Sequence, residues 1–537
     1  MPRGSRRRRR PRRGRPRRLL RGRPADAVVT PGTTGEVAAI ARACHEERVP
    51  FTVRGAGTAH WRQRAASRRL VMAMARFDRI LAIDAANLFA VVQPNVVTGD
   101  LHAAVDAHGL FYPPDPASLA QSSIGGNVAE DAGGPRGFKY GTTRRYVLAL
   151  EAVLPTGEVI RTGAKTVKNV TGYALTDLLV GSEGTLAVIT EVTLRLLPRP
   201  AAQRTFTATY ATVAAAADAV TALVRAGVVP ATIEMLDGPS LAAVAAHVGR
   251  PMAPAGTEAL LLVDVDGSVP AADHDAAAAV AACRAGGATS IDEAATPESR
   301  ARLWEARRQL SYALRAVAPR KINHDVVVPR GRVPQLYDTL ARLRQTYDLR
   351  IAAFGHAGDG NLHVNLLVDP ADAGEMARAR EAERALFEAV VALEGAISGE
   401  HGIGYAKAAY LGLQLSAAEI ALMARLKQAF DPHGVLNPGK LWDTTPDDLA
   451  GLSPSRGADR GRRYWRLAMR TIRCTSRAGS GWRNERRRRP ASLRYGNSAS
   501  RTHRVPPPPP PGLEVPGAAG RPAHGPAARG TPRPGRR

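Results

Sequence analysis

The sequence predicts a mixed α+β chain with two folded domains. From residue 25 to about residue 197, short apolar strands alternate with helical segments, which is the rhythm of an α/β domain. After Pro198 and Pro200, strands rich in Thr, Leu and Val alternate with alanine-rich helices. A chain of 537 residues is also too long for one simple core. We therefore expect one domain over residues 24–200 and a second over residues 201–445.

The first domain opens with a strand, a helix and a second strand. Residues 25–30 and 51–53 are the predicted strands. Between them, Thr33 and Glu36 have the spacing of a capping box, so a helix begins here. The apolar residues on one face of this helix are Val37, Ile40, Ala41 and Cys44.

The second domain is predicted from a similar alternation. Strands at residues 205–210 and 259–264 are each followed by a helix, at residues 211–226 and 273–285. The ordered pattern ends with residues 431–441. For this domain we expect an antiparallel sheet covered by helices.

Most of the positive charge lies outside these two domains. The formal net charge is +27, but residues 1–23 hold 13 arginines and no acid, and residues 451–537 hold 21 arginines and 3 acids. The body at residues 24–450 therefore carries a net charge of −4. We predict that segments 1–23 and 446–537 are disordered. They favour a nucleic-acid-binding protein as an alternative, but the acidic body and the lack of interleaved aromatic residues count against it.

Cysteine and hydropathy patterns bear on the compartment. Cys44, Cys283 and Cys474 are far apart and form no C-x-x-C pair, which argues against a local iron–sulfur or zinc-ribbon site and against a disulfide framework. No stretch of about 18 apolar residues occurs, and no apolar core follows the basic start. We therefore expect a cytoplasmic protein without a transmembrane segment, and attachment to the inner face of a membrane stays open.

Paired glycines mark the first set of candidate binding residues. Residues 112–141 read YPPDPASLAQSSIGGNVAEDAGGPRGFKYG and contain two Gly-Gly pairs, and residues 181–185 read GSEGT. Glycine lets backbone N–H groups approach a phosphate closely. Taken alone, such pairs more often indicate tight turns.

In combination, these motifs resemble one family. The order YPPDP, IGGNVAE, AGGPR, KYG, TVKNVTGY and GSEGTL is similar to the vanillyl-alcohol oxidase-like flavoproteins, and among them to the FAD-linked oxidases. That branch includes the glycolate oxidase FAD subunit, D-lactate dehydrogenase (cytochrome) and D-2-hydroxyglutarate dehydrogenase. The resemblance spans residues 25–443 and implies a PCMH-type FAD-binding domain of two α/β subdomains, followed by an FAD-linked oxidase C-terminal domain. It also implies that FAD lies along Gly55, Gly57, Thr58, Pro114, Asp115, Gly125, Gly126, Asn127, Gly133, Gly134, Gly181, Glu183, Gly184, Thr185 and Asn437.

Histidine and glutamate gather in the second domain. His356 and His363 lie in FGHAGDGNLHVN, where a glycine-rich turn precedes a predicted strand, and Glu400 and His401 lie in SGEHGIG. Two imidazoles and a carboxylate suit a divalent metal with open coordination positions, such as Zn or Mn. A single buried histidine is more often structural. The resemblance implies that His356, His363 and Glu400 bind the metal and that His401 is the catalytic base.

Oxidation of a 2-hydroxy acid needs these residue types. A metal lowers the pKa of the hydroxyl group, a histidine takes its proton, and the flavin accepts the hydride from C2. The substrate carboxylate needs a fixed cation. Arg307 stands where the family has such an arginine, and Lys321 is a weaker candidate; a solvent-facing position is the alternative for each.

We therefore expect an FAD-dependent dehydrogenase for glycolate or D-lactate. No clustered cysteines are present to carry electrons onward, so the expected acceptor is external: an iron–sulfur subunit, a quinone, a cytochrome or an electron-transfer flavoprotein. Asn437, in the NPGK segment, resembles the family's closing element near the flavin, and a C-terminal turn is the alternative.

One segment departs strongly from the family. GAGT at residues 55–58 begins a phosphate loop, but residues 59–69 read AHWRQRAASRR, where small residues are usual. Bulky Trp and Arg side chains prevent close approach to a pyrophosphate. We interpret this segment as a local reading-frame change, because the codons CAC TGG CGG CAG CGC for HWRQR read Thr-Gly-Gly-Ser after a one-base shift. We interpret the arginine-rich ends in the same way, as products of a changed reading frame. For the chain as a whole, an inactive relic of a flavin fold is a further alternative.

Three single residues also depart from the family pattern. Asp131 stands where Asn is common, Ala174 where Asp is common and His324 where an acidic residue is common. Because His324 immediately precedes Asp325, its part in a metal site stays open.

Overall fold

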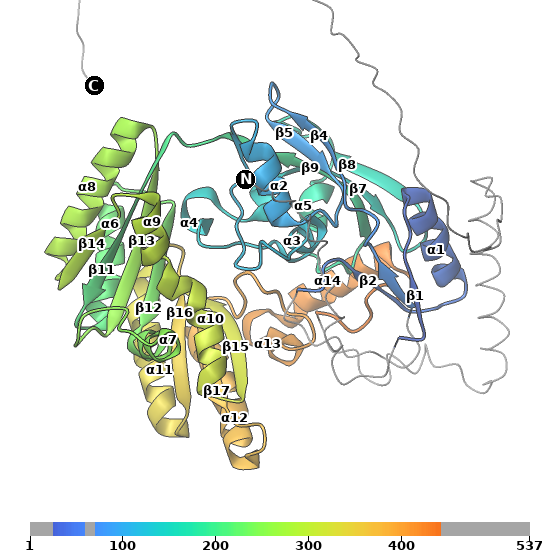
Figure 1. The fold of residues 1–537 in the computed structure, drawn as a ribbon. Coiled ribbons are helices and arrows are strands. Elements are labelled where there is room, and N and C mark those ends of the chain that lie inside the picture. Colours follow the sequence, from blue (N-terminus) through green and yellow to red (C-terminus); the bar gives the residue numbers. More distant parts are fainter. Residues whose placement is uncertain (1–24, 59–69, 442–537) are drawn as a thin grey trace, which may run out of the picture. The chain divides into compact units, whose positions relative to one another are not determined.

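The computed structural model describes residues 25–58 and 70–441 (Figure 1). Residues 59–69 and the two arginine-rich segments, with the disorder and reading-frame interpretations attached to them, lie outside the described residues. Within the described ranges, no helix combines the length and the apolar character that a membrane crossing requires.

The N-terminal region begins with a small parallel sheet. Its strands, in order across the sheet, are β1 (Ala27–Val29), β3 (Leu70–Ala73) and β2 (Phe51–Arg54). Helix α1 (Thr34–Glu46) begins where predicted, because the Thr33 side chain accepts a hydrogen bond from the Glu36 N–H. The predicted apolar face of α1 is buried in the same core as β2 and β3. The predicted strand–helix–strand unit is therefore confirmed.

The second sheet of this region is antiparallel throughout, in the order β4-β5-β9-β7-β8. The α/β rhythm thus produces parallel pairing only in the first sheet. Short turns join β4 to β5 and β7 to β8, and such hairpins pair antiparallel, whereas a parallel pair needs a long crossover. The five strands are β4 (Ile80–Asp84), β5 (Phe89–Val92), β7 (Val147–Val153), β8 (Val159–Gly163) and β9 (Val188–Arg195).

Short helices and one small strand pair complete the region. The helical segments are α2 (Thr98–Asp106), α3 (Ile124–Glu130), α4 (Gly137–Tyr140), η1 (Thr143–Tyr146) and α5 (Leu175–Leu179). The strand pair is β6 (Leu110–Phe111) with β10 (Leu197–Pro198). Strand β10 leads directly into the second region, whose first strand begins at Ala202.

The second region is built on one seven-stranded antiparallel sheet in the order β14-β11-β13-β12-β16-β17-β15. The predicted antiparallel sheet is confirmed, and its register is continuous between β11 and β13 and between β15 and β17. The strands are β11 (Ala202–Tyr210), β12 (Thr232–Asp237), β13 (Ala259–Gly267), β14 (Ser290–Glu293), β15 (Arg320–Val327), β16 (Arg350–His356) and β17 (Asn361–Val368). The helices are α6 (Val213–Arg225), α7 (Gly238–Val248), α8 (Val269–Ala285), α9 (Pro297–Leu303), α10 (Glu305–Val317), η2 (Arg330–Arg332), α11 (Val333–Tyr347) and α12 (Ala373–Ala392).

The two faces of this sheet pack on different helices. One face shares a core with α6, α8, α11 and α12, and the other face shares a core with α7 and α10. Successive strand residues point to opposite faces, so on β12 Met235 joins the first core and Leu236 joins the second. Glu234 therefore lies on the face that α7 and α10 cover.

The last described segment returns to the N-terminal region. After η3 (Ala408–Tyr410), α13 (Leu411–Gln414) and α14 (Ala417–Phe430), the backbone of Leu436 forms a parallel bridge with Phe51 at the start of β2. Figure 1 shows α14 in orange near the blue β1 and β2. The Lys427 ammonium group donates to the carbonyl of Thr185 and to that of Leu436. The C-terminal segment thus ties the two regions together.

Candidate functional site

Two histidines and a glutamate, side chains of the types that can bind a metal, converge at one end of the seven-stranded sheet. His356 ends β16, His363 lies on β17 after a tight turn, and Glu400 lies in the loop after α12. Glu400 Oε1 is 3.5 Å from His363 Nε2 and 3.7 Å from His356 Nε2. The turn needs Gly360, because its φ is +81° and a Cβ there would meet the Val328 carbonyl oxygen at 2.0 Å.

These distances fit a divalent metal. One atom from each of His356, His363 and Glu400 lies within 4.8 Å of the others. Ligands at bond lengths of about 2.1 Å in a tetrahedron lie roughly 3.4 Å apart, which is close to the 3.5 and 3.7 Å from Glu400 to the two histidines. Three protein donors leave a coordination position for a substrate oxygen. The donor set and its geometry are therefore compatible with a catalytic metal.

A fourth, unpredicted residue orients this cluster. Glu234 on β12 is fully buried; one carboxylate oxygen is hydrogen-bonded to His356 Nδ1, and the other accepts from Arg307 Nε. A proton shared with Nδ1 directs His356 Nε2 toward Glu400, which is the usual arrangement behind a metal-binding histidine. Burial alone would raise the pKa of Glu234, but Arg307 and His356 hold it well below its ordinary value. An acidic residue in the apolar strand TIEMLD was the signal in the sequence.

Electrostatics inside the cluster favour ionised carboxylates. Burial would raise the pKa of Glu400, yet the hydrogen bond from His356 and the charge of His356 lower it to about 2. Burial lowers the pKa of His363 well below its ordinary value, so this imidazole stays neutral and can bind a metal.

Arg307 lies beside the cluster rather than on a solvated helix face. It projects from α10, its side chain is 10% exposed, and its guanidinium carbon is 5.0 Å from the centre of the Phe354 ring. Its Nε is engaged by Glu234. Lys321 on β15 lies nearby and donates to the Ser311 hydroxyl; burial and the charges of Arg315 and Arg307 lower the pKa of Lys321 to about 8.

His401 stacks against the cluster. Its ring lies 5.4 Å from the ring of His363, and its Nε2 is 3.9 Å from Glu400 Oε1. Its Nδ1 lies 3.3 Å from a carboxylate oxygen of Asp325, a buried residue that sequence reasoning did not assign. The residues expected as metal ligands and base are therefore brought together in one place.

His324 is on the other side of the sheet. It packs edge-on against Phe387 of α12, 5.1 Å between ring centres, and its Nε2 is 3.4 Å from Glu383. Burial and the charge of Lys407 lower the pKa of His324 to about 3. The open question about His324 is thus answered by strand alternation, because Asp325 faces the cluster and its neighbour faces away.

A glycine loop of the N-terminal region abuts the cluster. A Cβ built at Gly133 would lie 3.1 Å from Glu400 Oε2, and one at Gly137 would lie 2.5 Å from Asp359 Oδ2. Gly134 has a φ of +142°, and a Cβ there would meet the Asp115 carbonyl oxygen at 2.6 Å. Glycine is required at position 134, and through this loop the N-terminal region reaches the His/Glu cluster.

Other predicted cofactor residues adjoin this loop. Asp115 accepts a hydrogen bond from the Arg136 N–H, and burial raises the pKa of Asp115 to about 6. The carbonyl of Pro114 is hydrogen-bonded to His102 Nε2 at 2.9 Å. Asp131 caps α3 in the left-handed region and pairs with Arg144, a backbone conformation that Asn and Asp tolerate.

The first Gly-Gly pair forms a helix instead of the tight turn that the pair alone suggests. Gly125 and Gly126 lie in the first turn of α3, and a Cβ at Gly125 would meet Pro94 at 2.5 Å. Buried Asn127 donates to the Thr98 hydroxyl. The glycines are needed here for close packing as well as for any ligand.

The start of the first phosphate loop lies against the same helix. The Ala56 N–H donates to the hydroxyl of Ser123, which caps α3, and a Cβ at Gly55 would meet that hydroxyl at 2.7 Å. Gly57 has a φ of +72°, and Thr58 is the last residue before the segment outside the described ranges. Residues 55–58 and α3 are therefore neighbours, as a shared cofactor requires.

The loop at residues 181–185 is held by the C-terminal segment. Gly181, Glu183 and Gly184 all have positive φ, and the Asn437 amide donates to the Gly184 carbonyl at 2.7 Å. Thr185 donates back to the Ser182 carbonyl. The side-chain amide oxygen of Asn437 (Oδ1) is buried and has no hydrogen-bond partner among the described residues. It can therefore accept a hydrogen bond from a ligand such as a cofactor.

The Glu183 side chain points at the loop that carries Glu400 and His401. Its carboxylate accepts hydrogen bonds from the N–H groups of Ile403 and Gly404 at 2.6 to 3.1 Å. Glu183 is 3% exposed. The carboxylate links the N-terminal loop to the segment that carries His401, and a cofactor contact for this residue stays a prediction.

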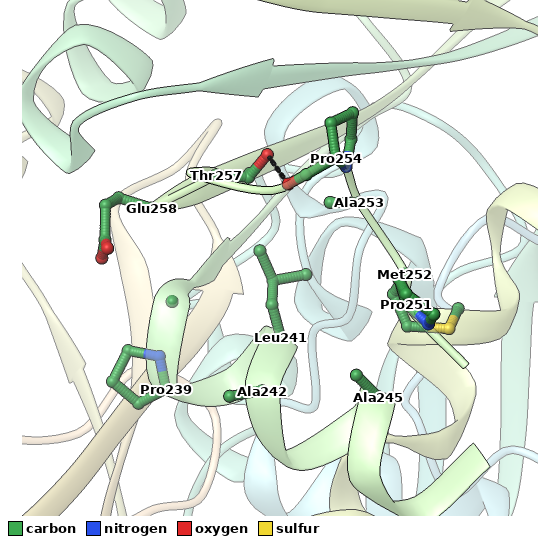
Figure 2. Close-up of a pocket in the computed structure, with 11 residues that line it drawn as sticks. Pro239, Leu241, Ala242, Ala245, Pro251, Met252, Ala253, Pro254, Thr257 and Glu258 are labelled. Carbon is green, nitrogen blue, oxygen red and sulfur yellow. Dashed lines mark hydrogen bonds between the residues drawn. The ribbon is translucent and has the colours of Figure 1, made fainter. Parts of the chain in front are cut away.

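A separate surface hollow of about 500 Å³ has a different character. It lies between α7 and residues 251–258, and Figure 2 shows its mainly apolar lining, with Glu258 at one edge. None of the lining residues belongs to the His/Glu cluster. We attach no catalytic role to it.

Comparison with known proteins agrees with this geometry. Residues 25–163 match the family described as FAD binding domain, and residues 199–441 match FAD linked oxidases, C-terminal domain. The chain is 43% identical over 420 residues to glycolate oxidase subunit GlcD of Bacillus subtilis, a match that covers 78% of this chain and 89% of the relative.

This chain belongs to the FAD-linked oxidase family, and it is an FAD-dependent oxidoreductase. It is also 39% identical to glycolate oxidase subunit GlcD of Escherichia coli K12, over 77% of this chain and 83% of the relative. A D-lactate dehydrogenase of Anaerostipes hadrus is 34% identical, over 78% and 89%.

Solved structures confirm the predicted fold at low sequence identity. A p-cresol methylhydroxylase with bound substrate superposes with a TM-score of 0.64 at 16% identity, covering 78% of this chain and 88% of that one. A 4-ethylphenol oxidase from Gulosibacter chungangensis has a TM-score of 0.62 at 19% identity, over 78% and 89%. Neither a nucleic-acid-binding protein nor an inactive relic finds support among these relatives.

Proposed function

We propose that this oxidoreductase converts a small 2-hydroxy acid, glycolate or D-lactate, to the corresponding 2-oxo acid. The observation that carries the proposal is the contact of the loop at Gly133 with Glu400 of the His/Glu cluster. A substrate held at the cluster would lie beside the FAD-binding domain. The flavin could then accept the hydride from C2 on one side, while the cluster acts on the hydroxyl group on the other. Relatives named for glycolate and D-lactate support the choice of substrate.

We propose that His356, His363 and Glu400 hold a zinc or manganese ion. The donor types, their 3.5 and 3.7 Å separations and the Glu234 hydrogen bond behind His356 support this. When bound, the metal would polarise the substrate hydroxyl and FAD would accept the hydride.

The chain's own residues would then bind, orient and deprotonate the substrate. His401 would take the hydroxyl proton at Nε2, because its Nδ1 faces Asp325. Arg307 and Lys321 would attract the substrate carboxylate, and the half of the guanidinium that Glu234 does not engage is the part suited to it. The Phe354 ring under Arg307 would keep water from this end of the site.

We infer that electrons leave to an acceptor outside the chain. In the described ranges the cysteines are Cys44 and Cys283, both buried and in different regions of the fold, so no cysteine cluster is built there. An iron–sulfur subunit, a quinone, a cytochrome or an electron-transfer flavoprotein would fill this role.

The test is anaerobic reduction of the flavin in the full-length purified chain. The visible absorbance bands of oxidised flavin should bleach on addition of glycolate or D-lactate, and L-lactate should have a much smaller effect. Metal content measured by plasma mass spectrometry should approach one ion per chain, and removal of that ion with a chelator should slow bleaching without releasing flavin.

Two results would overturn the proposal. Flavin that stays oxidised with every 2-hydroxy acid would reject the substrate class. Bleaching at an undiminished rate in metal-free protein would reject the metal role of the cluster. A chain that contains no flavin until residues 59–69 are replaced by small residues would locate the fault in that segment.

A further inference from the structure

One buried carboxylate accepts hydrogen bonds from the backbone of residues 399–401, the loop that carries the proposed base. Asp325 Oδ2 accepts hydrogen bonds from the N–H groups of Gly399, Glu400 and His401, at 2.7, 2.7 and 2.9 Å. The Ser398 hydroxyl lies 3.2 Å from the same oxygen. Three successive backbone donors on one oxygen determine the conformation of the segment that presents both a proposed metal ligand and the proposed base.

The second oxygen of this carboxylate faces side chains. Asp325 Oδ1 lies 3.3 Å from His401 Nδ1 and 2.6 Å from the Lys407 ammonium nitrogen, and Lys407 also donates to the carbonyls of Asp325 and Ile397. Asp325 is fully buried.

Sheet register places this carboxylate relative to the metal ligands. Asp325 is the direct cross-strand partner of His363 in the β15–β17 pair, so both side chains lie on the same face. The base, its partner and a metal ligand are therefore related through the backbone of two paired strands, which is a rigid support.

We propose that Asp325 is the positioning residue of His401: it orients the imidazole and selects the tautomer with the proton on Nδ1. A neutral imidazole that donates from Nδ1 has its lone pair on Nε2, the nitrogen that faces the His/Glu cluster. The inference rests on the proposed role of His401 as base. It assigns Asp325 an effect on proton transfer through His401, in addition to the support that its hydrogen bonds give to the loop.

Asp325→Asn is the primary test, in the full-length, flavin-loaded protein. The amide oxygen can still accept from the loop, but an amide NH₂ would face the imidazole and favour the tautomer with the proton on Nε2. The rate of anaerobic flavin reduction should fall by roughly 10²- to 10⁴-fold, on the scale seen when an aspartate behind a catalytic histidine becomes asparagine. Binding of the 2-oxo-acid product, measured by the shift of the flavin spectrum, should change less than about 3-fold.

Ser398→Ala is the matched control for loop support. It removes a hydroxyl that contacts the same carboxylate and leaves the Asp325–His401 contact intact. It should lower the rate by less than about 5-fold, the loss of one neutral hydrogen bond. Equal losses in Asp325→Asn and Ser398→Ala would overturn the proposal, because Asp325 would then only support the loop.

A double-mutant cycle separates this inference from the proposed function. In a His401→Ala background, adding Asp325→Asn should slow flavin reduction by less than about 3-fold, because the residue through which it acts is absent. A penalty that persists in full would overturn the inference. An unimpaired His401→Ala protein would instead reject the proposed base, and a wild-type protein that no hydroxy acid reduces would reject the proposed function.

Asp325→Glu covers the case in which the asparagine variant does not fold. It keeps the negative charge for Lys407 and moves the oxygens by one methylene group. The rate should fall by more than about 10-fold while the melting temperature stays within a few degrees. A folded glutamate variant with the wild-type rate would overturn the proposal.

Discussion

In the loops proposed to contact FAD, at residues 55–58, 133–134 and 181–185, backbone conformation sets the shape: glycines with positive φ angles and close approaches to neighbouring atoms recur there. On the side of the proposed metal site, the His/Glu cluster is shaped by buried charge. His356, Arg307 and Glu234 hold one another, as do His401, Lys407 and Asp325. The conformation of such loops needs no ligand, whereas buried charges must already be paired within the protein because an unpaired buried charge is costly. Mutations in the two regions should therefore fail in different ways.

The largest expected effect separates the two sides completely. Glu400→Gln removes the charge of a proposed metal ligand while it keeps the size of the side chain. Flavin reduction should fall by about 10³-fold or more, because the metal no longer polarises the hydroxyl, and the bound metal should fall below one ion per chain. Flavin content should stay at the wild-type level; loss of flavin together with metal would mean that the two sides are not separable.

Breaking the pairing behind the metal should cost stability as well as activity. Glu234→Gln leaves Arg307 and His356 without their buried counter-charge, so the free energy of unfolding should fall by about 3–5 kcal/mol in urea titration. Metal affinity should fall about 10- to 100-fold. Glu258→Gln, an exposed change immediately before the neighbouring strand β13, is the control and should alter neither quantity. A stable Glu234→Gln protein would contradict the charge-paired description.

The carboxylate that joins the two sides should show an intermediate effect. Glu183→Gln weakens charge-assisted hydrogen bonds to Ile403 and Gly404, so the rate of flavin reduction should fall about 10-fold while flavin affinity changes little. The measurement is flavin reduction against flavin dissociation in the same preparation. A variant that loses flavin at unchanged rate would place Glu183 with the cofactor, as the sequence first suggested.

The smallest effect concerns the pH dependence of KM. The pKa of Lys321 in the folded chain is about 8, below its ordinary value of 10.5, because of burial and the charges of Arg315 and Arg307. The ammonium charge is therefore present below pH 8 and lost as the pH rises through it. The KM for the hydroxy acid should rise a few-fold between about pH 7 and 9, and Lys321→Met should remove that rise. An identical profile in the variant would exclude Lys321 from substrate binding.

Much of the fold was predictable because it is encoded locally. The spacing of Thr33 and Glu36, the apolar face of α1 and the alternating strands of the second region are patterns over a few residues, and each appears in the structure. The pairing direction of the second sheet was not predictable in this way, because it depends on which strands meet. The same holds for Gly125, whose motif indicated a turn and which lies in a helix packed on Pro94.

The sequence by itself determined the chemical inventory: the histidines, the acid of SGEHGIG and the glycine motifs that identify the family. Only the tertiary structure decided which of these residues act together. Glu234, Asp325 and Lys407 belong to no short motif. Glu234 meets His356 only where β12 pairs with β16, and Asp325 meets Lys407 only where β15 lies against the segment after α12. The physical reason is that the protonation state and the role of a buried charged group depend on its neighbours, and sheet register and packing determine those neighbours.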